Sequence, residues 1–253
     1  MHSKAQALDN YLTLEDGGLK FKQIMLYIVS TPIGNLEDIS QRACRILAEV
    51  DIILAEDTRK SGLLLKKLSL GKKRFISFFE HNEDRRLKEA VDLLNQGFDL
   101  ALITDAGTPC LSDPGYKLVR RCRKEKIPVT AVPGPSAVTN ALVLSGYPTN
   151  SFFFAGFLPR KKGQRRKKLE QYRQYHTTLV LMESPYRAEK LLQDIREILP
   201  WSRVALVREM TKIHEEVIAG GADEVLEAIK DRKLKGEITL VLDLRPEKTK
   251  EEG

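Results

Sequence analysis

LITDAGTPCLSDPG, residues 102–115, is the stretch that decides the fold class. It begins as an apolar run typical of a buried strand and passes at once into a turn rich in aspartate, glycine and proline. Ligand loops of α/β proteins leave the carboxyl ends of parallel strands, which is the place that this turn takes. The stretch therefore predicts an α/β protein with a ligand site at one edge of its sheet.

Apolar runs with strand character alternate with helical patterns along the first half of the chain. The strand candidates are 25–30, 51–55, 74–78, 100–104 and 128–132. Apolar residues three and four apart predict helices between these runs, including 39–50, 85–97 and 115–126. Strands joined by crossover helices form parallel sheets that are covered on both faces. We therefore expect a largely parallel sheet between two layers of helices.

The pattern starts again after a helix of small residues that ends at Gly146. Further strand candidates are 151–156, 177–184, 202–209 and 237–244, and helices are expected near 163–175, 185–198 and 221–232. The predicted fold class is thus α/β, with two α/β domains. The predicted boundaries are an N-terminal extension at 1–24, a first domain at 25–146, a second domain at 147–246 and a charged tail at 247–253.

The composition is that of a globular protein with a weak preference for polyanions. Of its 253 residues, 42% are hydrophobic and 30% are charged, and the net charge is +7. No apolar run approaches the roughly 20 residues of a membrane span, and the N-terminus does not resemble a signal peptide, so a cytoplasmic protein is expected. Cys44, Cys110 and Cys122 are too scattered for a disulfide framework or a zinc site.

The loop STPIGNLEDIS, residues 30–40, does not match a nucleotide-binding fingerprint. Gly34 is its single glycine, whereas the dinucleotide fingerprint needs three and the phosphate-binding P-loop two. A conventional dinucleotide site or P-loop is therefore excluded.

The loop that follows the strand 100–104 is also unsuited to phosphate. Two prolines in it lack an N–H group, and Asp105 and Asp113 repel anions. Backbone carbonyls, a carboxylate and small side chains instead suit a cationic or zwitterionic ligand. Asp113 and Pro114 are predicted to cap and begin the next helix, which gives them a structural role.

The segment VPGPSAV, residues 132–138, predicts a stiff crossing between the two halves. Such crossings between domains are also places where ligand clefts form. Ser136 either caps the helix that follows or contacts a ligand, and both interpretations remain open.

Eight motifs in order resemble one known family. They are LYIVSTPIGNLEDIS (26–40), AEDTRKSGLLLKKL (55–68), FFEHNE (78–83), LITDAGTPCLSDPGYKLVR (102–120), VPGPSAVTNALVLSG (132–146), FAGFLPRKKGQRR (154–166), MESPYR (182–187) and REMTKIHEE (208–216). Together they resemble the ribosomal RNA small-subunit methyltransferase I family, from about Met25 to Leu244. That family has the tetrapyrrole-methylase fold and methylates the ribose 2′-hydroxyl of a cytidine in the decoding region of small-subunit ribosomal RNA. Its members normally begin near Met25, so residues 1–24 depart from the pattern.

The resemblance implies a cofactor, S-adenosylmethionine, bound in a cleft between two α/β domains, usually in a homodimer. In this family the turn after the fourth strand wraps the cofactor largely through its main chain. The residues implied to line the cofactor site are Ile33, Thr104, Asp105, Ala106, Gly107, Thr108, Ser136, Ala137, Met182, Gly236 and Thr239.

Methyl transfer from a sulfonium is an in-line displacement with a neutral leaving group, so no metal is required. The main demand is geometry, and a ribose hydroxyl must also lose its proton, which a base or a polarising cation would assist. The candidates in the motif loops are Asp57, Arg59, His81, Asn82, Glu183, Arg187, Arg208 and Glu209. Each charged candidate could equally form a structural ion pair. Glu183 and His81 are the favoured bases.

The segment RKKGQRRKK, residues 160–168, holds seven Lys or Arg in nine positions, and tyrosines follow at 172 and 175. Cations bind phosphates and aromatic rings stack on unpaired bases, so the segment predicts binding of single-stranded RNA. The RNA-binding candidates are Arg160, Lys161, Lys162, Arg165, Arg166, Lys167, Lys168 and Arg187. The expected partner is 16S ribosomal RNA within the small ribosomal subunit.

Two other functions are compatible with the same motifs. A tetrapyrrole methyltransferase shares the fold, but its small carboxylate-rich substrate has little use for a long basic run. A non-catalytic RNA-binding assembly factor would not need the cofactor loops.

Overall fold

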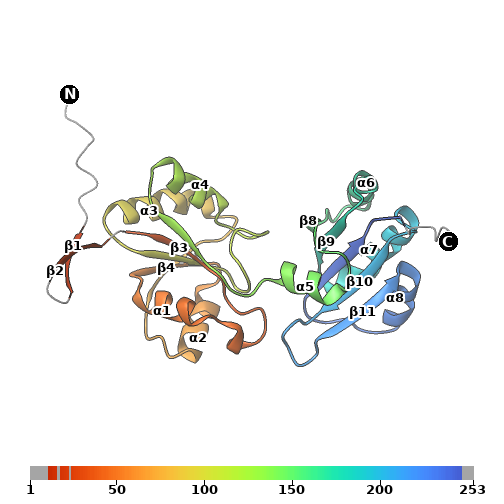
Figure 1. Ribbon diagram of the computed structural model, residues 1–253, viewed down its shortest axis with the longest axis horizontal. Coiled ribbons are helices and arrows are strands. Elements are labelled where there is room, and N and C mark those ends of the chain that lie inside the picture. Colours follow the sequence, from red (N-terminus) through yellow and green to blue (C-terminus); the bar gives the residue numbers. More distant parts are fainter. Residues whose placement is uncertain (1–10, 16–17, 23, 247–253) are drawn as a thin grey trace, which may run out of the picture. The chain divides into compact units, whose positions relative to one another are not determined.

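The computed structural model describes residues 11–15, 18–22 and 24–246 (Figure 1). The chain divides into two compact units: unit 1 comprises Met1–Pro32 and Leu36–Pro135, and unit 2 comprises Ile33–Asn35 and Ser136–Gly253. The predicted boundary after Gly146 differs from this division by one helix, α5 (Ala137–Ser145). That helix packs against strands of the second unit, because its apolar side chains Val138, Ala141 and Leu142 are buried there.

The described part of unit 1 holds a five-stranded sheet in the order β5-β4-β6-β3-β7. Its strands are β3 (Leu26–Val29), β4 (Ile52–Ala55), β5 (Arg74–Ser77), β6 (Leu100–Ile103) and β7 (Val129–Val132). All neighbouring strands are parallel, as predicted. A separate two-stranded antiparallel pair, β1 (Tyr11–Glu15) and β2 (Gly18–Lys22), precedes this sheet within the predicted extension. Apart from Ile24, the rest of that extension and the predicted tail lie outside the described residues.

Helices cover both faces of this sheet, because alternate residues of each strand point to opposite sides. Ile52 and Leu54 of β4 pack in a cluster with α3 (Glu83–Asn95) and α4 (Tyr116–Lys124). Ile53 and Ala55 pack in a second cluster with α1 (Gln41–Glu49) and α2 (Thr58–Lys67). Figure 1 shows these two helix pairs on opposite sides of the strands. A continuous apolar run is therefore what a strand buried on both faces requires.

The second sheet has the order β11-β10-β12-β9-β8 in the described residues. Its strands are β8 (Phe152–Phe157), β9 (Thr178–Glu183), β10 (Arg203–Arg208), β11 (Glu216–Gly221) and β12 (Ile238–Asp243). Only β8 and β9 are parallel in this sheet, and the other neighbours are antiparallel. The antiparallel pairing arises because β10 turns directly into β11, a strand that the sequence did not predict.

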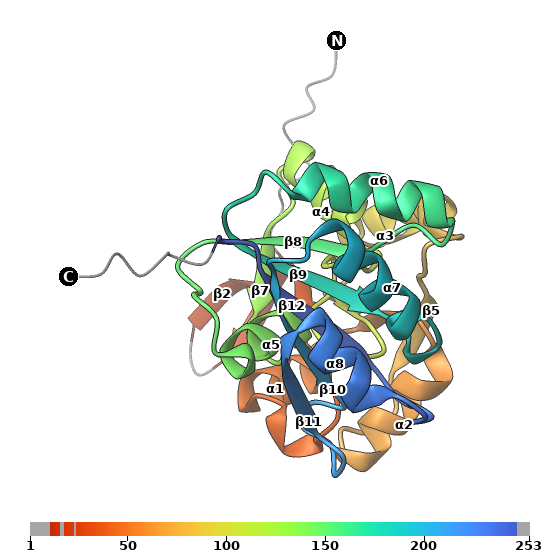
Figure 2. The same ribbon diagram turned by 90° about the vertical axis from the view of Figure 1, so that its right-hand side faces the viewer.

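Three helices cover one face of the second sheet: α6 (Lys162–Tyr172), α7 (Pro185–Ile198) and α8 (Ala222–Ile229) (Figure 2). Their apolar side chains share a core cluster with Leu179 and Leu181 of β9 and with Leu240 of β12. The intervening Val180 is also buried but points to the opposite face of its strand, and α5 packs against β9, β10 and β12. The unit is thus a sheet between two layers of helix.

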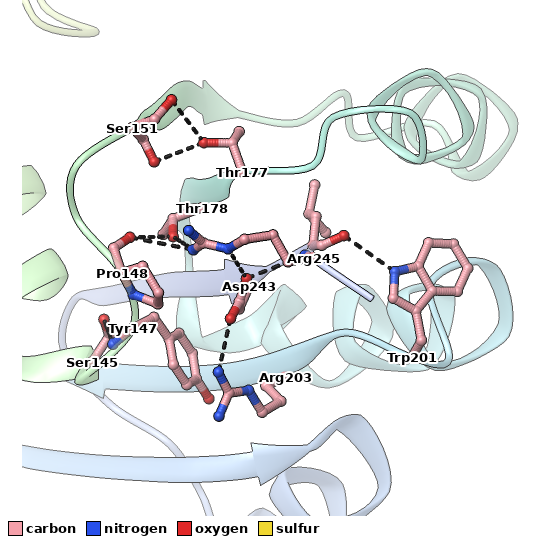
Figure 3. Close-up of polar contacts among 11 residues, drawn as sticks. Ser145, Tyr147, Pro148, Ser151, Thr177, Thr178, Trp201, Arg203, Asp243 and Arg245 are labelled. Atoms are coloured by element: carbon pink, nitrogen blue, oxygen red, sulfur yellow. Dashed lines mark hydrogen bonds and ion pairs between the residues drawn. The ribbon is translucent and has the colours of Figure 1, made fainter. Parts of the chain in front are cut away.

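A polar network closes the edge of this sheet where β9 and β10 begin and β12 ends (Figure 3). Asp243 accepts hydrogen bonds from Arg203 Nη2 and Arg245 Nε, both at 2.8 Å, and Arg245 Nη2 donates to Thr178 Oγ1 at 2.7 Å. The Arg203 guanidinium also lies 5.0 Å from the ring centre of Tyr147. Burial raises the pKa of Asp243, but the two arginine hydrogen bonds outweigh it and lower the pKa overall. This edge is therefore held by charge-assisted bonds.

Candidate functional site

The loop after β6 is fixed to the loop after β3 by main-chain hydrogen bonds. Thr31 N donates to Gly107 O at 2.9 Å and Gly107 N donates to Thr31 O at 3.0 Å. The Thr31 hydroxyl also donates to Thr104 O at 3.1 Å. Gly107 has φ 84°, a conformation that glycine adopts without strain. The Thr104–Thr108 loop is consequently held in one conformation, as a loop that binds through its main chain needs to be.

The loop after β7 joins the same assembly. The Thr108 hydroxyl donates to Pro135 O at 3.1 Å, and it lies 2.9 Å from the Ser30 hydroxyl. Gly134 allows this close approach, since a Cβ there would lie 2.9 Å from Ser30 Cβ. Three loops that leave carboxyl ends of parallel strands are therefore joined within unit 1, where α/β proteins bind ligands.

Asp105 orders the start of α2. Its carboxylate accepts hydrogen bonds from Asp57 N at 3.2 Å and from Lys60 Nζ at 2.6 Å. Its own N–H donates to Glu56 Oε2 at 3.3 Å. The resemblance implied Asp105 as a cofactor residue. It did not point to Glu56 or Lys60, although both belong to the motif EDTRKSG. That motif was expected to be a loop, and it becomes helical from Thr58.

Asp57 is the N-cap of α2, where its carboxylate accepts a hydrogen bond from Arg59 N at 2.9 Å. The Arg59 guanidinium returns to the same carboxylate with an Nη2–Oδ2 distance of 2.9 Å. These hydrogen bonds from Arg59 lower the pKa of Asp57 to about 2. A carboxylate with so low a pKa is a weak base. Asp57 and Arg59 therefore form a helix cap with a surface ion pair.

The predicted role of Asp113 as a helix cap is wrong. The N-cap of α4 is Gly115, at φ 128°, and in the described part of the chain this helix has no side-chain capping hydrogen bond at its N-cap. Glu83, at the start of α3, instead accepts a hydrogen bond from Gly115 N at 3.0 Å in a buried position. A Cβ on Gly115 would lie 2.4 Å from Leu102 Cδ2, so the close packing of this turn on β6 requires glycine. The carboxylate that satisfies the turn comes from a distant segment of the chain.

Asp113 lies instead within the electrostatic influence of Glu56 and Asp105. Burial, followed by repulsion from these two carboxylates, raises the pKa of Asp113 to about 7. A cation placed among them would relieve the repulsion. The three carboxylates thus fit the positively charged sulfonium and ammonium groups of S-adenosylmethionine. Among the described residues, no cluster of side chains is suited to a metal ion.

The loop between β5 and α3 presents His81 to solvent. The His81 ring lies 6.4 Å from the Phe79 ring in an edge-on arrangement. Asn82 shapes the loop, because its Oδ1 accepts a hydrogen bond from Phe79 N and its Nδ2 donates to Ser77 O. Asn82 is therefore structural, while His81 is free to meet a large partner.

Glu183 ends β9 in unit 2, and its side chain is fully buried. Its Oε1 accepts a hydrogen bond from Ser184 N at 2.8 Å. Its Oε2 lies 3.0 Å from Arg187 Nη2 but has no partner with hydrogen-bond geometry within the described ranges of the chain. Arg187 directs that nitrogen to Leu158 O at 2.9 Å. Glu183 therefore keeps one carboxylate oxygen that accepts no hydrogen bond from the described residues and that faces the charge of Arg187.

Met182 and Thr239 lie opposite each other in the pairing of β9 with β12. Thr239 is buried and Met182 is half-buried. Ser136 precedes α5 as its N-cap residue but makes no capping hydrogen bond through its side chain. The capping interpretation of Ser136 is thus unsupported, and its hydroxyl and the half-buried Ala137 remain candidates for ligand contact.

The first loop contributes a short segment to unit 2. Ile33 is buried, and Asn35 N donates to the Thr211 hydroxyl at 3.0 Å. A Cβ on Gly34 would lie 2.5 Å from Lys212 Cγ, so the lone glycine of this loop serves close packing. The motifs around residues 33–35 and 211–212 are therefore neighbours in space.

Gly236 allows Glu209 to approach the turn before β12. Gly236 has φ 84°, and a Cβ there would lie 1.9 Å from Glu209 Oε1. That oxygen accepts hydrogen bonds from Lys212 Nζ at 2.8 Å and from Glu237 N at 3.2 Å. The hydrogen bond from Lys212 lowers the pKa of Glu209. Glu209 therefore has a structural role, because it holds the turn before β12 in place.

Arg208 lies at the end of β10 and is mostly buried. Its guanidinium is 3.5 Å from Glu216 Oε2, while its buried Nε has no hydrogen-bond partner in the described part of the chain. A buried donor without a partner costs free energy unless a ligand or water satisfies it. Arg208 thus remains available to an acceptor.

The basic segment 160–168 divides into two classes of side chain. Arg165 is buried, and its Nη2 lies 2.6 Å from Asp194 Oδ2 on α7. Arg166 contacts the same carboxylate at 3.0 Å and also pairs with Glu197. The exposed side chains are Arg160, Lys161, Lys162, Lys167 and Lys168. Two of the seven cations therefore anchor α6 to α7, and five face solvent.

Comparison with known sequences identifies the family of the chain. The family model for Tetrapyrrole (Corrin/Porphyrin) Methylases matches residues 25–226. A ribosomal RNA small subunit methyltransferase I from Thermotoga maritima is 48% identical over 217 residues, which cover 86% of this chain and 97% of that protein. The protein of the same description from Haemophilus influenzae is 44% identical over 225 residues, covering 88% and 79%.

Two solved structures share the fold. A cobalt precorrin-4 methyltransferase aligns with a TM-score of 0.64 at 16% identity, over 88% of this chain and 96% of that one. A uroporphyrin-III-C-methyltransferase from Thermus thermophilus aligns with a TM-score of 0.59 at 20% identity, over 87% and 94%. The predicted α/β fold class is thereby confirmed.

Proposed function

Since the chain belongs to the tetrapyrrole methylase family and, within it, to the ribosomal RNA small subunit methyltransferase I proteins, we propose that it methylates small-subunit ribosomal RNA. The donor is S-adenosylmethionine, and the proposed acceptor is the 2′-hydroxyl of a cytidine. The observation that carries the proposal is 48% identity to a relative of that description along almost its whole length. Five exposed cations on and just before α6 support a polyanionic acceptor.

We assign cofactor binding to the predicted set, with Thr104–Thr108 as its centre. When bound, S-adenosylmethionine supplies an electrophilic methyl group. The main chain of the pinned loop orients the cofactor, and Glu56, Asp105 and Asp113 favour its positive charges. The Asp105 carboxylate already accepts hydrogen bonds from Asp57 N and Lys60 Nζ. We therefore assign it two roles: it holds the loop in place, and its negative charge attracts the cofactor's positive charges.

Glu183 is the proposed acceptor of the ribose proton. Its buried carboxylate has one oxygen without a hydrogen bond, while Asp57 is too weak a base. His81 is exposed and is assigned to substrate contact. We assign to Arg208, whose buried Nε has no hydrogen-bond partner among the described residues, the stabilisation of an oxygen that gains negative charge.

The RNA surface is assigned to the five exposed cations of residues 160–168. Arg165, Arg166 and Arg187 support it indirectly, because each is held in an ion pair within unit 2. We further propose that the protein acts as a homodimer on the small ribosomal subunit in the cytoplasm. No helix among the described residues is long and apolar enough to cross a bilayer.

Transfer of labelled methyl groups tests the proposed function directly. The purified protein is incubated with labelled S-adenosylmethionine and either small-subunit RNA, small subunits or a uroporphyrinogen. Label in a cytidine ribose supports the proposal, whereas label in the tetrapyrrole would identify the other activity of this fold. If the protein bound no S-adenosylmethionine, the result would instead support the alternative function of a non-catalytic RNA-binding assembly factor.

Variants then separate the two binding sites. We expect Lys161→Glu with Lys167→Glu to abolish RNA methylation and to leave cofactor affinity nearly unchanged, because the substitutions act only on phosphate contacts. Lys190→Glu, an exposed charge reversal on α7, is the matched control. Asp105→Ala should weaken cofactor binding, and unchanged affinity in a folded variant would contradict the cofactor assignment.

A further inference from the structure

Unit 1 contains a groove of about 670 Å³ that the proposed function does not use. It lies between α2 and β5, elements that Figure 2 labels, and β5 forms an edge of the described sheet. Its wall is largely apolar and includes Leu65 and Phe75, while Lys66, Lys72 and Lys73 stand among its lining residues. The groove therefore combines an apolar surface with ammonium groups.

The turn after α2 brings these lysines together. Ser69 and Gly71 both have positive φ, 57° and 75°, which reverses the chain within a few residues. Ser69 N donates to Lys66 O at 3.1 Å, so the turn continues directly from the last turn of the helix. Lys73 Nζ is fixed by donating to Val50 O at 2.9 Å. The groove is thus framed by an ordered turn.

The segment KKLSLGKKR, residues 66–74, holds five cations and no acid. Lys66, Lys67, Lys72 and Arg74 are exposed, and none forms an ion pair with the described residues. Two of them end α2, where the helix dipole favours cations. The dipole does not account for Lys72 and Arg74, which lie beyond the helix, so the segment has more positive charge than its local structure requires.

Gly62 keeps one wall of the groove open. It lies inside α2, where glycine weakens a helix, yet a Cβ there would meet nothing within 4 Å. Neither packing nor backbone conformation therefore demands glycine at this position. The space beside Gly62 is therefore open.

We propose that this groove receives an unpaired nucleotide of the RNA substrate, with the base against the half-buried Phe75 and the open side of Gly62, and with the neighbouring phosphates at Lys66 and Lys72. Apolar surface for a base and cations for the backbone are the two elements of single-strand recognition. The inference rests on the proposed function and adds a second RNA contact, on unit 1, to the one assigned to α6.

The test is binding of the full chain to small-subunit RNA, measured over a series of salt concentrations. Lys66→Glu with Lys72→Glu should lower affinity at least tenfold and reduce the slope of log affinity against log salt by about 1.4, because about 0.7 is lost for each single-strand phosphate contact. Lys88→Glu, an exposed reversal on α3, should change neither quantity appreciably.

Gly62 provides a test that leaves every charge in place. Gly62→Leu should fill the groove and lower affinity about tenfold without changing the salt slope, since a stacked base is lost but no phosphate contact is. Gly62→Ala should bind nearly as the unchanged protein does. Wild-type binding by both the Leu variant and the double lysine variant would overturn the proposal. If the double lysine variant bound RNA more weakly while Gly62→Leu bound it normally, the lysines would form only a charged surface, and the nucleotide assignment would be overturned.

The same samples distinguish the two proposals. If the unchanged protein transfers no methyl group to RNA and does not bind it, the proposed function fails. If the protein methylates RNA and the groove variants bind and react normally, only the groove assignment fails. Far-ultraviolet circular dichroism and cofactor affinity are measured for each variant, and both should match the unchanged protein, so that a loss of binding reports on RNA.

Discussion

Replacing Asp113 with asparagine should stabilise the protein at high pH and leave it unchanged at low pH. The pKa of Asp113 is about 7 in the folded protein, because burial and then Glu56 and Asp105 disfavour its charge. An unfolded aspartate has a pKa of about 3.9. Between these values the folded state holds a proton that the unfolded state has lost, so this group lowers the free energy of unfolding as pH rises.

The size of the effect follows from the difference in pKa. A difference of about three units corresponds to at most about 4 kcal/mol at about 1.36 kcal/mol per unit. Asp113 is only partly buried, and solvent screens its interactions, so we expect about 1–2 kcal/mol. Asparagine has nearly the same shape and cannot ionise, which removes the penalty without opening a cavity.

Urea denaturation of both proteins at pH 4.5, 6 and 8 measures the effect. The Asn variant should exceed the unchanged protein by about 1–2 kcal/mol at pH 8 and by less at each lower pH. Asp92→Asn removes an exposed negative charge from α3 and controls for the change in net charge. A stability difference for Asp113→Asn that stays constant across this range would refute the reasoning.

Three further substitutions test other contacts. Arg165→Ala should lower the free energy of unfolding by about 3 kcal/mol, because it leaves the buried Asp194 partly unpaired. Lys167→Ala should change the free energy of unfolding by less than about 0.5 kcal/mol. Equal effects of the two substitutions in urea denaturation would contradict the division of the basic segment into buried and exposed cations. Gly236→Ala should cost about 2 kcal/mol, since its Cβ cannot coexist with the present position of the Glu209 carboxylate. Asp243→Asn should destabilise by about 1–3 kcal/mol at neutral pH. Because the folded pKa of Asp243 is lowered, that contribution exists above about pH 3.9 and disappears as pH falls through the folded value, so thermal unfolding of the two proteins should converge in acid.

The three central strands of the first sheet could be predicted because they are buried on both faces and their sequences are continuous apolar runs. β11 escaped prediction because none of its residues is fully buried and its last two residues are glycines, which are typical of turns. The direction of the strands in the second sheet also depends on β11. A strand's apolar pattern reports burial, and it does not report whether the neighbouring strand is parallel.

The site was less predictable where distant residues complete a local structure. Asp113 stands where a helix cap is expected, but Glu83 satisfies that turn from another helix. Arg165 stands in the same basic run as the exposed cations, and only the fold brings Asp194 to it. The motif loops were recognisable as a set, whereas the choice between surface and ion-pair roles required coordinates.

The double hydrogen bond between Thr31 and Gly107 has a thermodynamic consequence for ligand capture. A loop already fixed before binding loses little conformational entropy when its ligand arrives, so association with a small ligand there needs no slow rearrangement. The free lysines after Arg160 must each surrender rotamer freedom to contact a polyanion. Calorimetry should therefore find a small entropic cost of ordering for the small ligand and a large one for the polymer.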